Sequence, residues 1–116
     1  MKQLIKVMKA LSDPGRVKIL KMLQHRNMCV CEVQAALGIA QSTASNQLKV
    51  LEAADLIRFE KDGLWVNYML ADGEDNAYAK TLLAELKNWL EEDREIEKLI
   101  RRLPEIYRDD LCRKSV

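Results

Sequence analysis

Residues 27–56 constrain the fold more than any other part of the chain. Their pattern predicts a short helix at about residues 32–37, a break at Gly38 and a second helix at about residues 41–54. Two helices joined by a tight turn form a helix-turn-helix, in which the second helix enters the major groove of DNA. The chain is therefore predicted to fold around a helix-turn-helix.

The second of these predicted helices has one apolar and one polar face. Helical spacing places its apolar side chains in the core, namely Ala44, Leu48, Leu51 and Ala54. The opposite face is rich in amide and hydroxyl groups, which both donate hydrogen bonds to base edges and accept them. The DNA-binding residues predicted on this face are Gln41, Ser42, Thr43, Ser45, Asn46, Gln47 and Lys49.

A β-hairpin is predicted directly after this helix. Residues 57–61 and 64–70 alternate between apolar and polar positions around the Asp-Gly pair at 62–63, which is typical of a turn that needs positive φ values. A hairpin in this place forms the wing of a winged helix. Arg58 and Lys61 are then placed to contact phosphates beside the groove.

Further helices are predicted at about residues 3–11, 14–24 and 76–103. The apolar positions of the last helix repeat every three or four residues, over more turns than a small domain covers alone. Part of this stripe is expected to bury against a second copy of the chain, with the first helix as companion; the alternative is a helix that packs entirely on its own domain. The predicted dimer-interface residues are Leu4, Ile5, Met8, Leu82, Leu86, Trp89 and Leu90.

The length of 116 residues and the hydrophobic fraction of 48% fit one domain over residues 1–116, mainly α with a β-hairpin wing. Residues 1–70 hold ten Lys/Arg and six Asp/Glu, whereas residues 71–116 hold nine and twelve. A locally basic half fits a DNA-binding protein, because phosphates are met by local charge, although chance asymmetry is the alternative. No nucleophile–base pair, glycine-rich phosphate loop or carboxylate cluster indicates an enzyme.

The sequence also bears on the compartment. No apolar run approaches the roughly 20 residues of a membrane helix, and the lysine-bearing N-terminus has no small-residue cleavage site of a signal peptide. Three cysteines are an odd count that suits thiols kept for chemistry in a reducing compartment, not a disulfide framework. We therefore expect a cytoplasmic protein.

Cys29 and Cys31 form a Cys-x-Cys pair at the start of the helix-turn-helix. Residues two apart point to nearly opposite sides of a regular α-helix but to the same side of extended or first-turn backbone, so capture of one ion by both sulfurs favours a non-helical start. Two thiolates select soft ions, and a helix N-terminus is expected to lower the thiol pKa. The alternative is that both residues are small apolar members of the core.

Two more residues are candidate ligands for the same ion. His25, the only histidine, lies four residues before Cys29 and is either a ligand or a surface or capping residue. Cys112 supplies a third sulfur only if the tail folds back or a dimer partner provides it. Oxidation of the thiols to a disulfide or a sulfenate is the alternative chemistry of a redox sensor.

Taken as a set, these motifs resemble the ArsR/SmtB family of metal-responsive winged-helix repressors. The resemblance lies in LSDPGR (11–16), MCVCEVQAAL (28–37), QSTASNQLKVLEAADLI (41–57) and DGLWVNYML (62–70). The Cys-Val-Cys box looks like that of the arsenite-responsive branch. The resemblance implies a homodimer that binds palindromic operator DNA when empty. It also implies release of that DNA when As(III) or Sb(III) binds Cys29 and Cys31, which derepresses an arsenic-resistance operon.

The chain departs from the family pattern at two positions. Gln34 stands where some members carry a third cysteine, which leaves the third As(III) ligand open between water, a small thiol and Cys112. Gly15 stands where the family usually has Thr. The zinc-sensing branch needs His in its last helix and the cadmium/lead branch needs an N-terminal cysteine, and this chain has neither. The alternatives are another soft-metal or redox-sensing repressor, or a winged helix used only for protein contacts.

Overall fold

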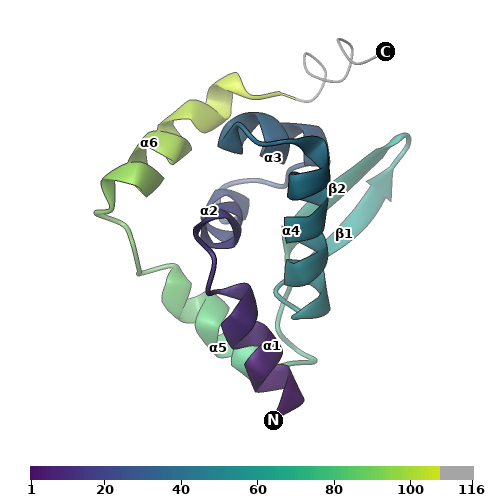
Figure 1. Ribbon diagram of the computed structural model, residues 1–116, viewed down its shortest axis with the longest axis vertical. Helices are drawn as coiled ribbons and strands as arrows, with labels where there is room; N and C mark the ends of the chain where they lie inside the picture. Colours follow the sequence, from purple (N-terminus) through teal and green to yellow (C-terminus); the bar gives the residue numbers. More distant parts are fainter. Residues whose placement is uncertain (108–116) are drawn as a thin grey trace.

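The computed structural model describes residues 1–107. The elements in chain order are α1 (Lys2–Ala10), α2 (Pro14–Leu23), α3 (Val30–Leu37), α4 (Gln41–Ala53), β1 (Ile57–Asp62), β2 (Trp65–Leu70), α5 (Ala77–Leu86), α6 (Arg94–Arg102) and the short 3-10 helix η1 (Leu103–Glu105). Figure 1 shows α2 near the centre, with α1 beside α5 at one end, α6 on one side and the hairpin projecting past α4. The prediction of a mainly α fold with a β-hairpin wing is confirmed.

Helix α2 is the centre of the core because its apolar residues are buried on most of its circumference. Asp13 begins the helix by accepting a hydrogen bond from the backbone N–H of Arg16 at 3.1 Å, and Pro14 occupies the first turn, as predicted. The most deeply buried apolar side chains around α2 are Val7, Ile19, Leu20, Met22, Met28, Val33, Leu48, Leu51 and Leu56. None of the helices within residues 1–107 has the length and apolar character to cross a membrane.

Helices α3 and α4 form the predicted helix-turn-helix. Gly38 ends α3 with a φ of 65°, in the left-handed region that glycine adopts without steric cost, and its N–H donates to the Gln34 carbonyl at 2.9 Å. The inward residues predicted for α4 are all buried, which confirms that face. Helix α3 begins at Val30, two residues before the predicted start, because Cys29 is its N-cap.

The predicted hairpin is present, but its turn lies one residue later than predicted. The strands pair antiparallel with Asp62 opposite Trp65, so the two turn residues are Gly63 and Leu64. Gly63 has a φ of 63°. Glycine at the first central position is the pattern of a type II′ turn, which needs one positive φ value and not the two of a type I′ Asp-Gly turn.

The prediction of one long helix at residues 76–103 is wrong. The structure has two helices there, α5 and α6, separated by residues 87–93. Leu90 has a φ of 64°, and left-handed backbone at a leucine cannot continue a right-handed α-helix. Because the apolar spacing carries on through the break, periodicity alone did not reveal it.

Buried and capping side chains explain where the two helices stop and start. The Lys21 ammonium is buried and donates to the carbonyl oxygens of Leu86 at 2.9 Å and Trp89 at 2.8 Å. A cation here binds carbonyl groups that lose their helical partners where α5 ends. Asp93 then caps α6 by accepting from the Ile96 N–H at 3.1 Å. Lys21 thereby stabilises the turn that separates α5 from α6.

Candidate functional site

The outward face of α4 carries most of the side chains predicted to bind DNA. The exposed members are Gln41, Ser42, Thr43, Asn46 and Lys49, whereas Ser45 is half-buried. Ala40 holds the N-cap position and offers no side-chain acceptor to the first amides of α4. Those amides and the positive end of the helix dipole are groups that bind a phosphate well. The arrangement therefore suits a nucleic-acid interface.

Gln47 is half-buried and its side chain is held by other residues of the chain, so it is not part of the exposed face; its contact with DNA stays a prediction. Its side chain accepts from Arg16 Nη1 at 2.8 Å and donates through Nε2 to Asp13 Oδ2 at 2.8 Å. Arg16 also donates to the carbonyl oxygens of Ala10 at 2.8 Å and Lys9 at 3.0 Å. Gln47 thus ties α4 to the end of α1 and the start of α2. Nothing in the local sequence pattern distinguishes it from its exposed neighbours.

The same cluster perturbs the carboxyl group of Asp13. Burial acts to raise the pKa of Asp13, but the Arg16 backbone N–H, the Gln47 amide and the Arg16 charge outweigh it and hold that pKa below its ordinary value of 3.8. The ionised carboxylate is therefore the form that holds Gln47 in place.

The hairpin places both of its predicted phosphate-binding residues in solvent. Arg58 and Lys61 lie on β1, and each is exposed. Arg58 Nη1 contacts Glu60 Oε1 at 2.9 Å, but an exposed ion pair of this kind is weak and open to exchange. The ring of Phe59 packs across the strands against Tyr68 at a centroid distance of 6.0 Å. This contact packs side chains across the middle of the hairpin.

Cys29 is the N-cap of α3 and Cys31 lies in its first turn. The Cys29 backbone is extended, with φ −89° and ψ 171°, so the non-helical start is confirmed for Cys29 only, and Cys31 already has helical backbone. Glu32 Oε1 accepts from the Cys29 N–H at 3.0 Å, and the Cys29 thiol faces the Glu32 N–H in a reciprocal capping box. Cys29 is buried and Cys31 is half-buried. We call these two residues the thiol pair.

The prediction that the helix N-terminus lowers the thiol pKa is wrong for Cys29. Burial is the largest influence and raises the pKa of Cys29 above its ordinary value of 9.0; the backbone N–H of Glu32 opposes it, and the Glu32 carboxylate adds to it. Desolvation of the charged form outweighs the favourable dipole. Cys29 is accordingly a protonated thiol at neutral pH, and a ligand must displace its proton.

Sequence reasoning missed the two charged residues that support the thiol pair. Arg26 Nη2 pairs with Glu32 Oε2, and Arg26 Nη1 donates to the carbonyl oxygens of Leu103 at 3.1 Å and Ile106 at 2.7 Å. Glu32 itself is buried. A signal for Glu32 existed, because Cys29-x-x-Glu32 has the spacing of a capping box with Cys in place of Ser or Thr. No local pattern could have found the two carbonyl groups.

The backbone just before the thiol pair is joined to the hairpin. Met28 donates to the Tyr68 carbonyl at 3.1 Å, and Tyr68 donates to the Met28 carbonyl at 2.7 Å. This isolated bridge adds a single antiparallel contact to the free edge of β2. The thiol pair therefore lies between α4, against which α3 packs, and the hairpin.

The structure gives the thiol pair no further ligand among the residues it describes. Within residues 1–107, no group of three or more His, Cys, Asp and Glu side chains is placed to hold a metal ion. His25 is exposed, at the end of the turn after α2. Cys112, one of the candidates for a third ligand, lies outside the described residues.

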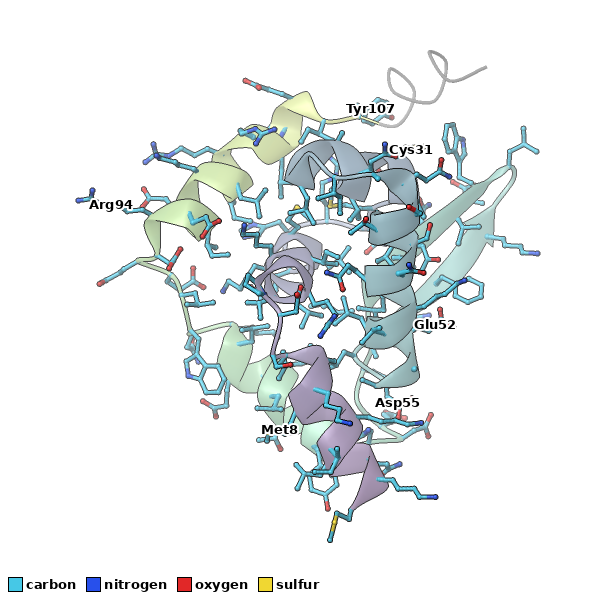
Figure 2. All side chains as sticks on the ribbon, in the orientation of Figure 1. Met8, Cys31, Glu52, Asp55, Arg94 and Tyr107 are labelled. Carbon is cyan, nitrogen blue, oxygen red and sulfur yellow. The ribbon has the colours of Figure 1, made fainter. Side chains whose placement is uncertain are left out.

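The predicted dimer-interface residues gather around the neighbouring helices α1 and α5. Ile5, Met8, Trp89 and Leu90 are exposed apolar side chains, Leu4 and Leu82 are half-buried, and Leu86 is buried in the core of its own chain. An apolar pocket of about 320 Å³ lies among them, lined by Leu11, Val17, Leu82, Leu86, Trp89 and Leu90. Figure 2 shows Met8 at the end of the molecule formed by α1 and α5, opposite the end that holds Cys31.

Comparisons with known proteins agree with this geometry. The family described as bacterial regulatory protein, arsR family, matches residues 13–58. A transcriptional repressor SmtB homolog of Synechocystis is 34% identical over 70 residues, covering 60% of this chain and 53% of that protein. An arsenical resistance operon repressor of Bacillus subtilis is 39% identical over 69 residues, covering 59% of this chain and 66% of that protein. The match thus spans between about half and two thirds of each of these two curated relatives.

A solved structure extends the match over more of the fold. It is a homodimeric winged helix-turn-helix DNA-binding domain from Mycobacterium bovis, described as a possible ArsR-family transcriptional regulator. It is 31% identical, has a TM-score of 0.65, and is matched over 78% of this chain and 81% of that chain. The helix-turn-helix, the hairpin and the sequence likeness lead to one conclusion: the chain belongs to the ArsR family of bacterial regulatory proteins.

Proposed function

We propose that this chain is a metalloid-responsive transcriptional repressor. It acts as a homodimer that binds a palindromic operator through α4 and the hairpin, and it releases the DNA when As(III) or Sb(III) binds the thiol pair. The observation that carries the proposal is the position of Cys29 as the N-cap of α3, the helix that packs directly on α4. A ligand at that cap acts on the support of the DNA-reading helix.

The DNA-binding step rests on the polar face of α4. Its exposed amide and hydroxyl groups suit base edges, and the exposed cations of α4 and β1 suit phosphates. In an ArsR-family winged helix the second helix of the motif is the groove-reading one. Gln47 has an indirect part in this proposal, because its side chain holds α4 in place.

Dimer formation rests on the apolar surface shared by α1, α5 and the turn after α5. Ile5 and Met8 on α1 and Trp89 and Leu90 after α5 are exposed, and an apolar pocket lies beside the last two; exposed apolar side chains gathered on neighbouring elements are typical of an interface. A two-fold axis through this surface would present two α4 helices to successive turns of a palindromic duplex. The M. bovis relative is described as homodimeric, which supports this assignment.

The donor set fits a soft, thiophilic ligand. Two sulfurs, one on the extended N-cap residue and one in the first turn of α3, fill two ligand positions, and within residues 1–107 no third ligating side chain accompanies them. Arsenite exchanges its oxygen ligands for thiol sulfurs with release of water and with no change of oxidation state. A third position then falls to solvent, a small thiol or Cys112. The same shortage of ligands argues against a four-coordinate structural zinc site.

Binding and DNA release are coupled through the cap of α3. Cys29 can give its sulfur to a ligand only by leaving its buried position against the Glu32 N–H. Loss of an N-cap costs a helix about 0.5 to 2 kcal/mol, which is enough to shift the first turn of α3 between two arrangements. Because α3 contacts both α4 and β2, such a shift moves the DNA-reading surface.

The deciding experiment is a DNA-binding titration of the reduced, full-length chain. A palindromic duplex selected by the protein from a random library is labelled, and its affinity is followed by fluorescence anisotropy as As(III), Sb(III), Cd(II), Zn(II) or peroxide is added. We expect As(III) and Sb(III) to weaken binding at least tenfold. Unchanged affinity with As(III) would overturn the sensing proposal, and release by peroxide alone would identify a redox sensor.

Matched variants separate the parts of this proposal. Cys29→Ser keeps an oxygen acceptor at the N-cap and removes only the sulfur, so it should bind the duplex like the wild type and no longer respond to As(III). Cys31→Ser should behave in the same way. Cys112→Ser tests the third ligand: a reduced As(III) affinity assigns that position to Cys112, and an unchanged affinity assigns it to solvent or a small thiol.

A further inference from the structure

Arg26 connects two parts of the chain that are far apart in sequence. One nitrogen of its guanidinium pairs with Glu32, and another donates to the carbonyl oxygens of Leu103 at 3.1 Å and Ile106 at 2.7 Å. Residues 103–106, which we call the strap, include η1 and follow α6. Arg26 is partly buried, so these charge-assisted bonds are less screened than those of the exposed ion pairs.

Glu32 passes this connection to the thiol pair. Its Oε2 receives Arg26 and its Oε1 accepts from the Cys29 N–H at 3.0 Å, while its own N–H faces the Cys29 thiol. Both carboxylate oxygens are thus occupied, and the side chain is buried. Movement of Cys29 away from the cap therefore has to disturb the carboxylate that Arg26 holds.

The strap lies at the same end of the molecule as the thiol pair (Figure 2) and is connected to it through Arg26 and Glu32. Arg26, Glu32 and Tyr107 line one pocket of about 240 Å³ together with Asn27 and Asn67. Figure 2 shows Cys31 and Tyr107 at the same end of the molecule. Leu103 and Ile106 are buried in the core that α6 shares with α2 and α3, so the strap has two attachments, one apolar and one to Arg26.

We propose that Arg26 is a positioning residue that couples ligand capture by the thiol pair to the docking of the strap. The coupling rests on the proposed function in one respect only, namely that binding of a thiophilic ligand is what moves Cys29 out of the cap. With Arg26 bound to the strap, Glu32 is held in the capping box and the thiol pair is closed. When Cys29 leaves the cap, Glu32 and Arg26 shift, and the carbonyl groups of the strap lose their donor.

Coupling of this kind is reciprocal. If ligand capture weakens strap docking by some factor, a docked strap weakens ligand capture by the same factor. Arg26 would therefore set the ligand concentration at which the protein responds, without touching the ligand. Arg26→Gln should bind As(III) about three- to tenfold more tightly than the wild type, because the closed state loses its support.

Hydrogen exchange of the full-length chain tests the coupling directly. The Ile106 amide donates to the Leu103 carbonyl at 3.0 Å, so its exchange rate reports whether the strap is docked. In the wild type, saturating arsenite should raise the exchange rate of peptides covering residues 103–107 at least threefold. In Arg26→Gln the strap should exchange rapidly without arsenite, and arsenite should add no further increase.

A matched control excludes a general effect of removing an arginine. Arg101 pairs with Glu97 at 2.6 Å on the exposed side of α6, and Arg101→Gln should keep the full wild-type response to arsenite. Arg26→Lys keeps the charge but not the forked geometry, and should show an intermediate response while folding normally. An arsenite response of the strap that persists in Arg26→Gln, or that is missing in wild type with arsenite bound, would overturn the proposal.

A metal-free arm keeps this test separate from the proposed function. In the Cys31→Ser, Cys112→Ser variant, iodoacetamide converts the Cys29 thiol to a thioether with loss of iodide and a proton, which expels Cys29 from the cap. The alkylated chain should show faster strap exchange only when Arg26 is present. If arsenite does not bind but this result holds, the coupling stands and the arsenite assignment is lost. If alkylation leaves the strap unchanged, the coupling is refuted.

Discussion

The two helices of the helix-turn-helix begin in opposite ways. Helix α3 starts at a buried Cys29 whose cap is closed by Glu32 and, behind it, by Arg26. Helix α4 starts at an exposed Ala40 that offers its first amides no side-chain acceptor. One helix N-terminus is satisfied from within the chain, whereas the other has donors to give to a partner.

This contrast separates two roles that the proposed repressor has to combine. An open helix start with exposed polar side chains binds DNA without rearrangement, and substitutions there should alter affinity more than stability. A closed, charge-supported start stores the interactions that a ligand must break, and substitutions there should alter stability and response. Substitutions at each helix start test whether the two differ in this way.

The largest effect is expected at the closed start. Glu32→Ala removes the carboxylate from both Arg26 and the Cys29 N–H, and should lower the free energy of unfolding by about 2 to 3 kcal/mol, somewhat less than for a fully buried pair. The control Glu97→Ala breaks the exposed pair with Arg101 and should cost only about 0.5 kcal/mol. Urea unfolding at pH 7 measures both. Equal costs would mean that the cap of α3 is not specially supported.

The second prediction compares neighbours on α4. Asn46→Ala should leave the unfolding midpoint unchanged and weaken binding to the selected duplex by about 1 to 3 kcal/mol, the range for one lost base contact. Gln47→Ala should instead lower stability by about 1 kcal/mol, because Arg16 and Asp13 each lose a hydrogen-bond partner. Gln47→Ala should weaken duplex binding less than Asn46→Ala does. Urea melts combined with anisotropy distinguish them, and a reversed pattern would place Gln47 in the groove.

The sequence predicted the elements that depend on local patterns. Apolar spacing predicted the inner face of α4, Gly38 predicted the end of α3, and Asp13 with Pro14 predicted the start of α2. The sequence did not predict features that depend on a residue far away in the chain. The break after α5 depends on Lys21, which lies 65 residues before Leu86, its first carbonyl partner.

The candidate site divides in the same manner. The thiol pair and most of the exposed face of α4 could be found from residue type and spacing. The inward turn of Gln47 toward Arg16 could not be found, because its neighbours carry equally polar side chains. The raised pKa of Cys29 was also missed, since the dipole effect is readable from the sequence and the depth of burial is not.

A third prediction closes the open helix start. Ala40→Asp supplies α4 with an N-cap acceptor and should raise the free energy of unfolding by about 0.5 to 1 kcal/mol. The new carboxylate would occupy the amides and repel phosphate, so affinity for the duplex should fall about fivefold, equivalent to about 1 kcal/mol. Ala40→Ser provides the cap without the charge and should stabilise the fold with a smaller loss of affinity. If both variants were stabilised and bound DNA like the wild type, the start of α4 would not contact the phosphate backbone of the DNA.

The smallest expected effect is a loss of stability in alkaline solution, which arises from Cys29 at the start of α3. Because the pKa of Cys29 is raised in the folded state, the native protein holds the thiol proton more tightly than the unfolded chain. The stabilisation is fully present below the ordinary value of 9.0 and is lost as the pH rises through the folded pKa. Wild type should therefore lose stability relative to Cys29→Ser above about pH 9, measured as the difference between their urea midpoints. Tyr68, whose pKa burial also raises, contributes equally to both proteins and cancels in the difference. If the difference between the two urea midpoints stayed constant from pH 7 to pH 10, or if wild type gained stability relative to Cys29→Ser, the folded state would not raise the pKa of Cys29. The start of α3 would then be as open to solvent as the start of α4.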